Sequence, residues 1–169
     1  MHPLVTLAKE TVDLYVRTGK VREIRDNDLS PELKQRAGVF VCLKIQDTLR
    51  GCIGTFEPQE ATIAHETVRN AISAATCDPR FPCLREQELD NIEYTVDVLT
   101  SPEPIKDKSE LDPRRFGVIV QAGGRRGLLL PDLDGVDTVD FQISIAMQKA
   151  GIPPGMPVKL FRFEVKRYQ

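Results

Sequence analysis

The residues best suited to chemistry lie at 49–54, LRGCIG, where a cysteine stands between two glycines and two positions after an arginine. If this segment is a strand, the bases of the Arg50 and Cys52 side chains share one face, roughly 6 to 7 Å apart. A guanidinium beside a thiol stabilises the thiolate, which is the nucleophilic form. Glycines in a strand mark a bulge or a close approach by a ligand or another backbone. Arg50 and Cys52 are therefore candidate catalytic residues, and Gly51 and Gly54 candidate binding residues. A cysteine packed as a small apolar side chain is the alternative.

A second cluster, CDPRFPC, occupies positions 77–83. Its two prolines stiffen the segment, and Asp78 and Arg80 either face a polar ligand or pair with each other at a helix exit. We take Asp78, Arg80 and Phe81 as candidate binding residues. Five residues separate the two cysteines, unlike the two of a zinc knuckle, so we predict neither a metal site nor a cofactor. His65 is interpreted as a surface histidine in preference to a base for Cys52.

The composition is that of an ordinary globular domain, with 169 residues, 41% hydrophobic and 28% charged. A net charge of −2 excludes a global basic field of the kind that gathers nucleic acid or anionic membrane. The four cysteines do not have the spacing of a small secreted framework, so we predict reduced thiols. The first twenty residues carry acids within their apolar pattern and resemble neither a signal peptide nor a membrane span. These features predict a soluble, cytoplasmic protein.

The apolar periodicity predicts helices interleaved with hairpins. Helices are expected at 3–18 and 139–150, each followed by a glycine, and from 63 to the residues before Asp78-Pro79, with a short helical turn at 86–89. Strands are expected at 39–45, 49–56, 92–98, 116–121, 127–130 and 161–165. Few strand-helix-strand crossovers are evident, so the fold class is α+β, with a mostly antiparallel sheet flanked by helices.

Five segments in order resemble the AMMECR domain family: LRGCIG at 49–54, DPRFP at 78–82, YTVDVLTSPEPI at 94–105, GLLLP at 127–131 and QKAGI at 148–152. The match covers nearly the whole chain and is closest to the bacterial and archaeal branch called AmmeMemoRadiSam system protein A. The resemblance implies one domain over residues 1–169, built of two unequal, intertwined subdomains, with LRGCIG near a cleft. It also implies two partners, a Memo-like protein and a radical SAM enzyme, and a role in RNA or nucleobase modification.

Two functions compete on this basis. In the first, the cleft binds a small molecule or a nucleotide, Arg50 or Arg80 holds its anionic group, and Cys52 attacks as a thiolate. In the second, the protein is a non-catalytic adaptor that docks a Memo-like partner through the same groove. A nucleic-acid binder acting alone ranks below both because of the net charge. Exposed hairpin ends allow a homodimer.

Overall fold

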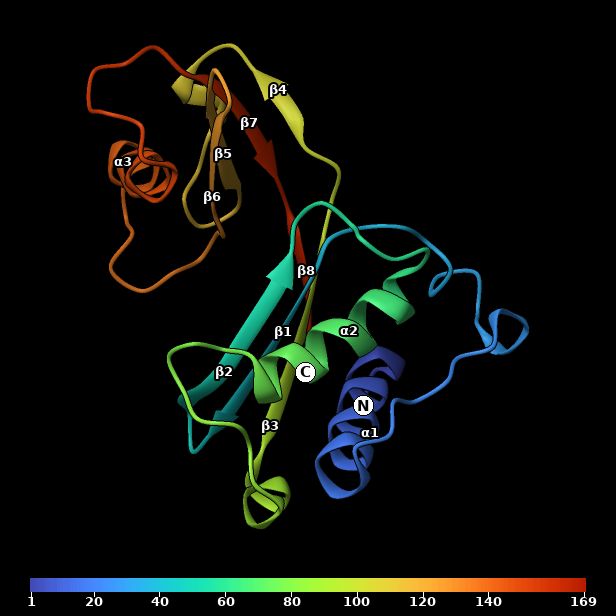
Figure 1. Cartoon of the computed structure of the whole chain (residues 1–169). Helices are drawn as coiled ribbons and strands as arrows, with labels where there is room; N and C mark the ends of the chain where they lie inside the picture. Colours follow the sequence, from blue (N-terminus) through green and yellow to red (C-terminus); the bar gives the residue numbers. More distant parts are fainter. The chain divides into compact units, whose positions relative to one another are not determined.

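The computed structural model describes residues 1–169 and has the α+β fold that the sequence predicts (Figure 1). The helices are α1 (Pro3–Thr18), α2 (Ile63–Thr76) and α3 (Val139–Ala150), with 3₁₀ turns η1 (Asp26–Asp28), η2 (Glu86–Asn91) and η3 (Lys108–Glu110). The strands are β1 (Val39–Ile45), β2 (Thr48–Thr55), β3 (Glu93–Leu99), β4 (Glu103–Ile105), β5 (Gly117–Ala122), β6 (Arg125–Leu129), β7 (Lys159–Phe163) and β8 (Val165–Tyr168). No helix combines the length and apolar character that a membrane span requires.

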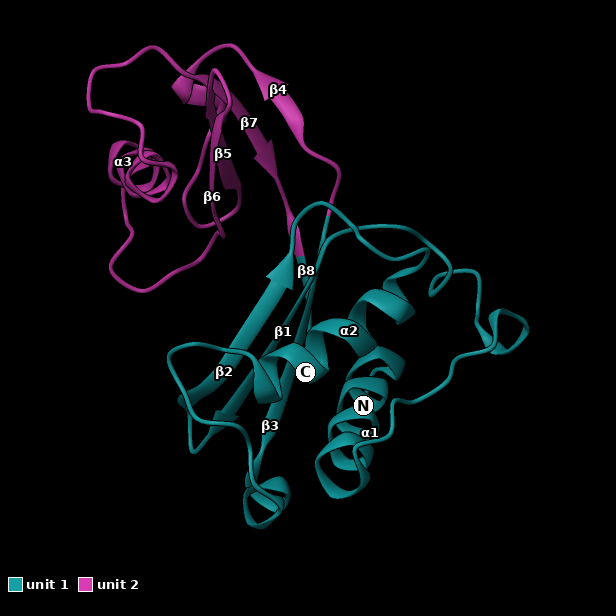
Figure 2. Cartoon of the chain, viewed as in Figure 1, with its two compact units in different colours: residues 1–99, 166–169 teal, residues 100–165 magenta.

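The chain divides into two compact units, each with its own sheet (Figure 2). Unit 1 comprises residues 1–99 and 166–169, and unit 2 comprises residues 100–165. The sequence pattern predicts one strand over 161–165, but the structure interrupts it at Glu164, so that β7 joins the sheet of unit 2 and β8 that of unit 1. Strand β4 was not predicted, because its three residues include Pro104; a proline is tolerated there because β4 is an edge strand.

The sheet of unit 1 has the strand order β2-β1-β3-β8, and α1 and α2 pack against it. Val39, Val41 and Leu43 alternate along β1 and are fully buried in the core between sheet and helices. The turn between β1 and β2 places Gln46 and Asp47 at φ values of 48° and 61°, the left-handed conformation of a two-residue hairpin turn. This turn sets the pairing register of the LRGCIG strand.

The sheet of unit 2 has the order β4-β7-β5-β6 and packs against α3. The side chain of Thr138 caps the start of α3, and Gly151 ends it in the left-handed conformation at a φ of 68°. Ile143 and Ala146 bring the buried face of α3 into a core that includes Val118 from β5. Unit 2 therefore has a separate hydrophobic core from unit 1.

Candidate functional site

The structure brings two of the predicted segments together, because Asp78 and Arg80 reach the backbone of Cys52. The Asp78 carboxylate, with its side chain 2% exposed, accepts hydrogen bonds from the backbone N–H of Cys52 at 3.0 Å and of Arg80 at 3.0 Å. It also accepts from Nε and Nη2 of Arg80 at 3.0 and 2.8 Å. Arg80 Nη2 in turn donates to the carbonyl of Cys52 at 3.4 Å. Both backbone polar groups of Cys52 are thus occupied.

This arrangement closes part of an open sheet edge. Strand β2 is an edge strand, and an edge presents unpaired N–H and C=O groups that recruit other chains. At Cys52 the carboxylate of Asp78 and the guanidinium of Arg80 take the place of a neighbouring strand. The Arg80 guanidinium and the two amide donors hold the pKa of Asp78 well below its usual range, against the opposing effect of burial. Of the two interpretations that the sequence leaves open, the structure contains the local ion pair.

Arg50 is committed to a neighbouring turn. The ladder between β1 and β2 slips so that Leu43 faces Gly51 while Lys44 faces Leu49, which leaves Arg50 as the extra residue of a bulge. Its Nε and Nη2 donate to the two oxygens of Glu88 at 2.8 and 3.1 Å.

The remaining hydrogen bonds of Arg50 also end on the chain itself, at the carbonyls of Pro82 (3.0 Å) and Cys83 (3.4 Å). The Arg50 side chain is only 13% exposed, and its guanidinium lowers the pKa of Glu88. Arg50 therefore anchors the segment from 82 to 88 to β2, and none of its hydrogen bonds goes to the sulfur of Cys52.

The cysteines correct one prediction. Cys42 and Cys52 face each other across β1 and β2, with Cα atoms 4.1 Å apart, and are joined in a disulfide. The prediction of reduced thiols is therefore wrong for this pair, because the hairpin register places the two sulfurs within bonding reach. Cys77 and Cys83 are exposed free thiols. A disulfide sulfur is not a thiolate, so the nucleophilic role predicted for Cys52 requires reduction first.

The two glycines of the segment allow close packing by the protein itself. A Cβ atom at Gly51 would lie 2.2 Å from the carbonyl oxygen of Ala74 on α2. A Cβ atom at Gly54 would lie 2.1 Å from the ring of Phe40. The close backbone approach that the sequence predicts is thus made by α2 at Gly51, and the space at Gly54 is filled by an aromatic ring.

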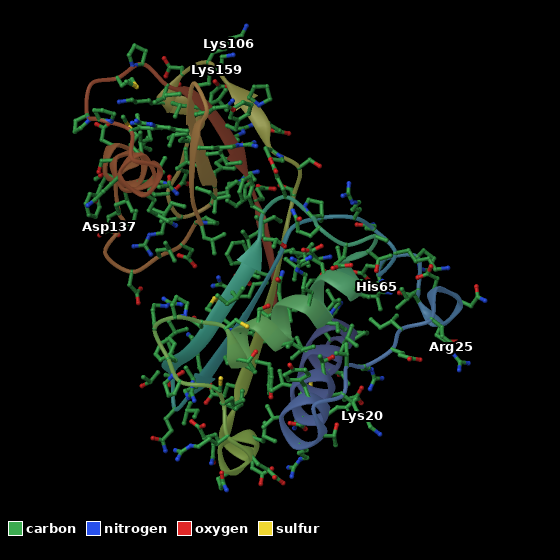
Figure 3. All side chains as sticks on the ribbon, in the orientation of Figure 1. Lys20, Arg25, His65, Lys106, Asp137 and Lys159 are labelled. Atoms are coloured by element: carbon green, nitrogen blue, oxygen red, sulfur yellow. A yellow bond between two sulfur atoms is a disulfide. The ribbon has the colours of Figure 1, made fainter.

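His65 lies at the start of α2, where Figure 3 labels it. Its Nδ1 is 2.8 Å from the Thr62 hydroxyl, which caps the helix. Gly51 packs near Ala74, nine residues further along α2, which corresponds to about 13 Å along a helix axis. This separation favours the interpretation of His65 as a surface histidine over a base for Cys52.

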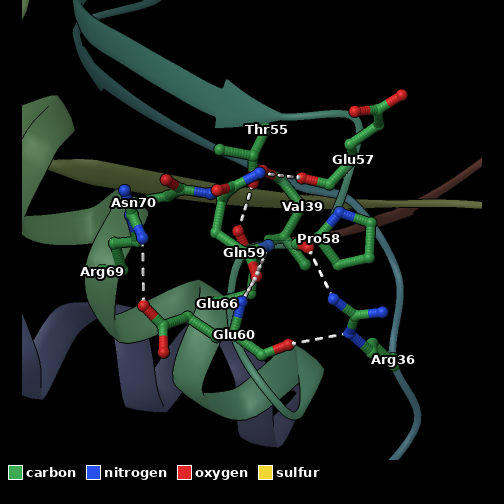
Figure 4. A network of polar contacts seen from close by, with 10 residues as sticks. All are labelled: Arg36, Val39, Thr55, Glu57, Pro58, Gln59, Glu60, Glu66, Arg69 and Asn70. Atoms are coloured by element: carbon green, nitrogen blue, oxygen red, sulfur yellow. Dashed lines mark hydrogen bonds and ion pairs between the residues drawn. The ribbon is translucent and has the colours of Figure 1, made fainter.

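Sequence reasoning missed a buried polar network around Glu66 (Figure 4). Glu66 is fully buried, and its carboxylate accepts hydrogen bonds from the Thr55 hydroxyl and from the backbone N–H groups of Gln59 (2.9 Å) and Glu60 (2.7 Å). Asn70, one turn later on α2, donates to the Thr55 hydroxyl at 3.1 Å. Three donors replace the water that a buried carboxylate loses.

The same network holds the loop that follows β2. Arg36 donates to the carbonyls of Pro58 at 2.9 Å and Glu60 at 3.2 Å, and Arg69 pairs with the Glu60 side chain at 3.1 Å. The sequence signal was available, because Glu66 and Asn70 are four residues apart on a helix whose other buried residues are mostly small and apolar. The network gives the site a rigid boundary at the end of β2.

The site thus consists of a stiff turn locked onto a sheet edge. The structure contains no group of three or more His, Cys, Asp or Glu side chains that could hold a metal ion. The turn presents two side chains to solvent, the half-buried ring of Phe81 and the guanidinium of Arg80. The Arg80 side chain is 55% exposed, and its Cζ lies 5.4 Å from the centroid of the Phe81 ring. Arginine and aromatic side chains are the types enriched in protein interfaces.

Comparison with known proteins gives consistent matches over the whole chain. The family model described as AMMECR1 matches residues 5–169. A protein of Thermotoga maritima is 53% identical and is matched over 99% of this chain and 98% of its own length. A protein of Clostridium acetobutylicum is 44% identical, but this chain spans only 36% of its length. The crystal structure of an uncharacterised protein from Pyrococcus horikoshii is 35% identical, with a TM-score of 0.85, and covers 97% of this chain and 88% of its own.

Proposed function

Because this chain belongs to the AMMECR1 domain family, we propose that it serves an AmmeMemoRadiSam-type modification system as a binding component. In this role it docks a Memo-like protein or delivers substrate to a radical SAM enzyme, and it carries no covalent intermediate of its own. The turn at residues 78–82 provides the docking surface. Membership of the AmmeMemoRadiSam branch, as the sequence motifs imply it, is part of the proposal.

The observation that carries the proposal is that the candidate catalytic side chains are engaged within the chain. Arg50 is bonded to Glu88 and to two carbonyls, Asp78 is bonded to Arg80 and to the amide of Cys52, and the Cys52 sulfur is in a disulfide. Each interaction consumes a group that catalysis would need free. The same interactions make the turn rigid, and a preorganised surface loses less entropy when it binds a partner.

The Clostridium relative supports a role in which the domain acts together with a second protein. Since this chain spans 36% of that protein, the domain is there covalently joined to further sequence. The Thermotoga relative, in contrast, is matched over 98% of its length. A domain that occurs both alone and as part of a larger chain is expected to have a surface for a second component.

The experiment is a binding titration of the purified chain against the Memo-like protein and the radical SAM enzyme of the same genome. Phe81→Ala should weaken the complex by about tenfold or more, because truncating an interface aromatic costs on the order of 2 kcal/mol. Phe141→Ala is the matched control, since Phe141 is an aromatic of unit 2 that is 49% exposed, and it should bind like the wild type. Circular dichroism verifies that both variants are folded.

Three results would overturn this proposal. If the wild type binds neither the Memo-like protein nor the radical SAM enzyme, the adaptor role is removed. Unchanged affinity of Phe81→Ala removes this surface, and so does an equal loss in Phe141→Ala.

A second candidate is catalysis by reduced Cys52, with the region around LRGCIG binding a small molecule or a nucleotide. The observation in its favour is that the Arg80 guanidinium donates to the backbone carbonyl of Cys52, so a positive charge lies beside the residue whose thiolate would form when the disulfide opens. Cys42→Ser leaves Cys52 without its disulfide partner and should then raise activity of the complete system, whereas Cys52→Ser should abolish it. Equal activity of Cys52→Ser and the wild type rules this candidate out.

A further inference from the structure

Unit 2 contains a polar pocket that the proposed function does not use. Its volume is about 360 Å³, and its lining includes Ser101, Glu103, Arg115, Phe116, Arg162 and Glu164. Ligand pockets in proteins span roughly 300–1,000 Å³, so this one has the size for a small molecule. All of these residues belong to the unit comprising 100–165.

Two arginines of the pocket are positioned by the same aromatic ring. Cζ of Arg162 lies 4.4 Å and Cζ of Arg115 lies 4.8 Å from the ring centroid of Phe116. A guanidinium within about 6 Å of an aromatic face is attracted to it. Phe116 thus brings together two positive charges that would otherwise repel each other.

Each arginine is also oriented by a glutamate. Nε of Arg115 donates to Glu164 at 2.7 Å, and Nε of Arg162 donates to Glu103 at 3.2 Å. Nη1 of Arg162 donates to the carbonyl of Glu110 at 2.8 Å. These bonds leave both Nη groups of Arg115, Nη2 of Arg162 and one oxygen of each paired glutamate without a hydrogen bond inside the chain. Donors and acceptors are therefore available side by side.

Stability alone does not account for this cluster. In the first ion pair the side chains of Arg115 and Glu164 are 67% and 45% exposed, and in the second those of Arg162 and Glu103 are 28% and 66% exposed. Ion pairs this accessible to water contribute little to stability. The lining balances two positive charges against two negative ones, so a polyanion or a polycation would meet like charges.

We propose that this pocket binds a small zwitterion of the α-amino-acid type. The ligand carboxylate bonds to the Nη groups of Arg115 and Arg162, and its ammonium group bonds to the remaining oxygens of Glu103 and Glu164. Arginine suits this task because its planar fork matches a carboxylate. Ser101, an exposed residue of the lining, offers a further hydroxyl. The site is independent of the docking turn at 78–82.

The test is calorimetric titration of the full chain with each proteinogenic L-amino acid, and with the N-acetyl and amide derivatives of whichever binds. At least one amino acid should bind, and each derivative, which lacks one charge, should bind about tenfold or more weakly, since a charged hydrogen bond contributes about 1.5–3 kcal/mol. Arg115→Gln should weaken binding by a similar factor. Arg114→Gln is the matched control, because Arg114 is the neighbouring arginine, is 65% exposed and lies outside the pocket lining.

Several results would overturn the proposal. These are a dissociation constant weaker than about 10 mM for every amino acid, binding of acetate or inorganic phosphate as tight as that of the amino acid, or equal losses in Arg114→Gln and Arg115→Gln. None of these results depends on a protein partner, so they leave the adaptor role untouched.

Discussion

Replacing Asp78 by alanine tests whether the turn at 78–82 is locked to the sheet edge. The substitution removes the acceptor of the Cys52 amide, at 3.0 Å, and both side-chain bonds to Arg80. A hydrogen bond to a charged group contributes about 1.5–3 kcal/mol. The ion pair between Asp78 and Arg80 adds at most about 1 kcal/mol to this loss, because the arginine is largely hydrated already. The expected loss in the free energy of unfolding is therefore roughly 2–4 kcal/mol.

Thermal unfolding at neutral pH measures this loss. For a chain of this size each kcal/mol lowers Tm by about 2–4 °C, so Asp78→Ala should unfold roughly 5–15 °C below the wild type. Hydrogen exchange should show faster exchange of the Cys52 amide. Asp137→Ala is the matched control, because Asp137 also pairs with an arginine, at 2.9 Å, but both side chains are 65% exposed (Figure 3). That variant should stay within about 0.5 kcal/mol of the wild type.

The pH dependence gives an independent check with Asp78→Asn. Because the folded pKa of Asp78 is held below its unfolded value of about 3.9, its ionised form stabilises the protein above that pH. This contribution is lost as the pH falls further toward the folded pKa. The stability gap between wild type and Asp78→Asn should therefore narrow below about pH 4. A gap that widens on acidification would refute the reasoning, as would equal losses in Asp78→Ala and Asp137→Ala.

Three further substitutions follow from the packing and the polar contacts. Gly51→Ala should lose about 1–3 kcal/mol, because its Cβ would lie 2.2 Å from a backbone oxygen, whereas Gly124→Ala, with nothing within 4 Å, should be neutral in the same denaturant titration. Glu66→Gln should lose about 1–3 kcal/mol in that assay, because its amide group would turn a donor toward groups that already donate. Arg50→Gln should destabilise the protein at neutral pH. Because Arg50 lowers the pKa of Glu88, the penalty should shrink as the pH falls below the unfolded glutamate pKa of about 4.3; a penalty that stays constant throughout the acid titration would contradict this account.

Signals within the sequence predict the local structure. Helix α3 begins at the capping residue Thr138, and α1 and α3 end at the left-handed glycines Gly19 and Gly151. The alternation of Val39, Val41 and Leu43 marks the side of β1 that faces the core. These signals act within a few residues, so the chain reveals them without knowledge of the fold. The identity of the segments that form the site, 49–54 and 77–83, was visible for the same reason.

The role of those two segments depends on tertiary contacts. The contact between Asp78 and Cys52 joins residues 26 positions apart, and that between Arg50 and Glu88 joins residues 38 apart. The disulfide between Cys42 and Cys52 depends on the hairpin register, and the bulge at Arg50 results from a one-residue shift in that register. Contacts between residues so far apart in the sequence depend on how helices and strands pack, and this packing cannot be predicted from residue types alone. Only the folded chain shows that residues suited to catalysis bind one another.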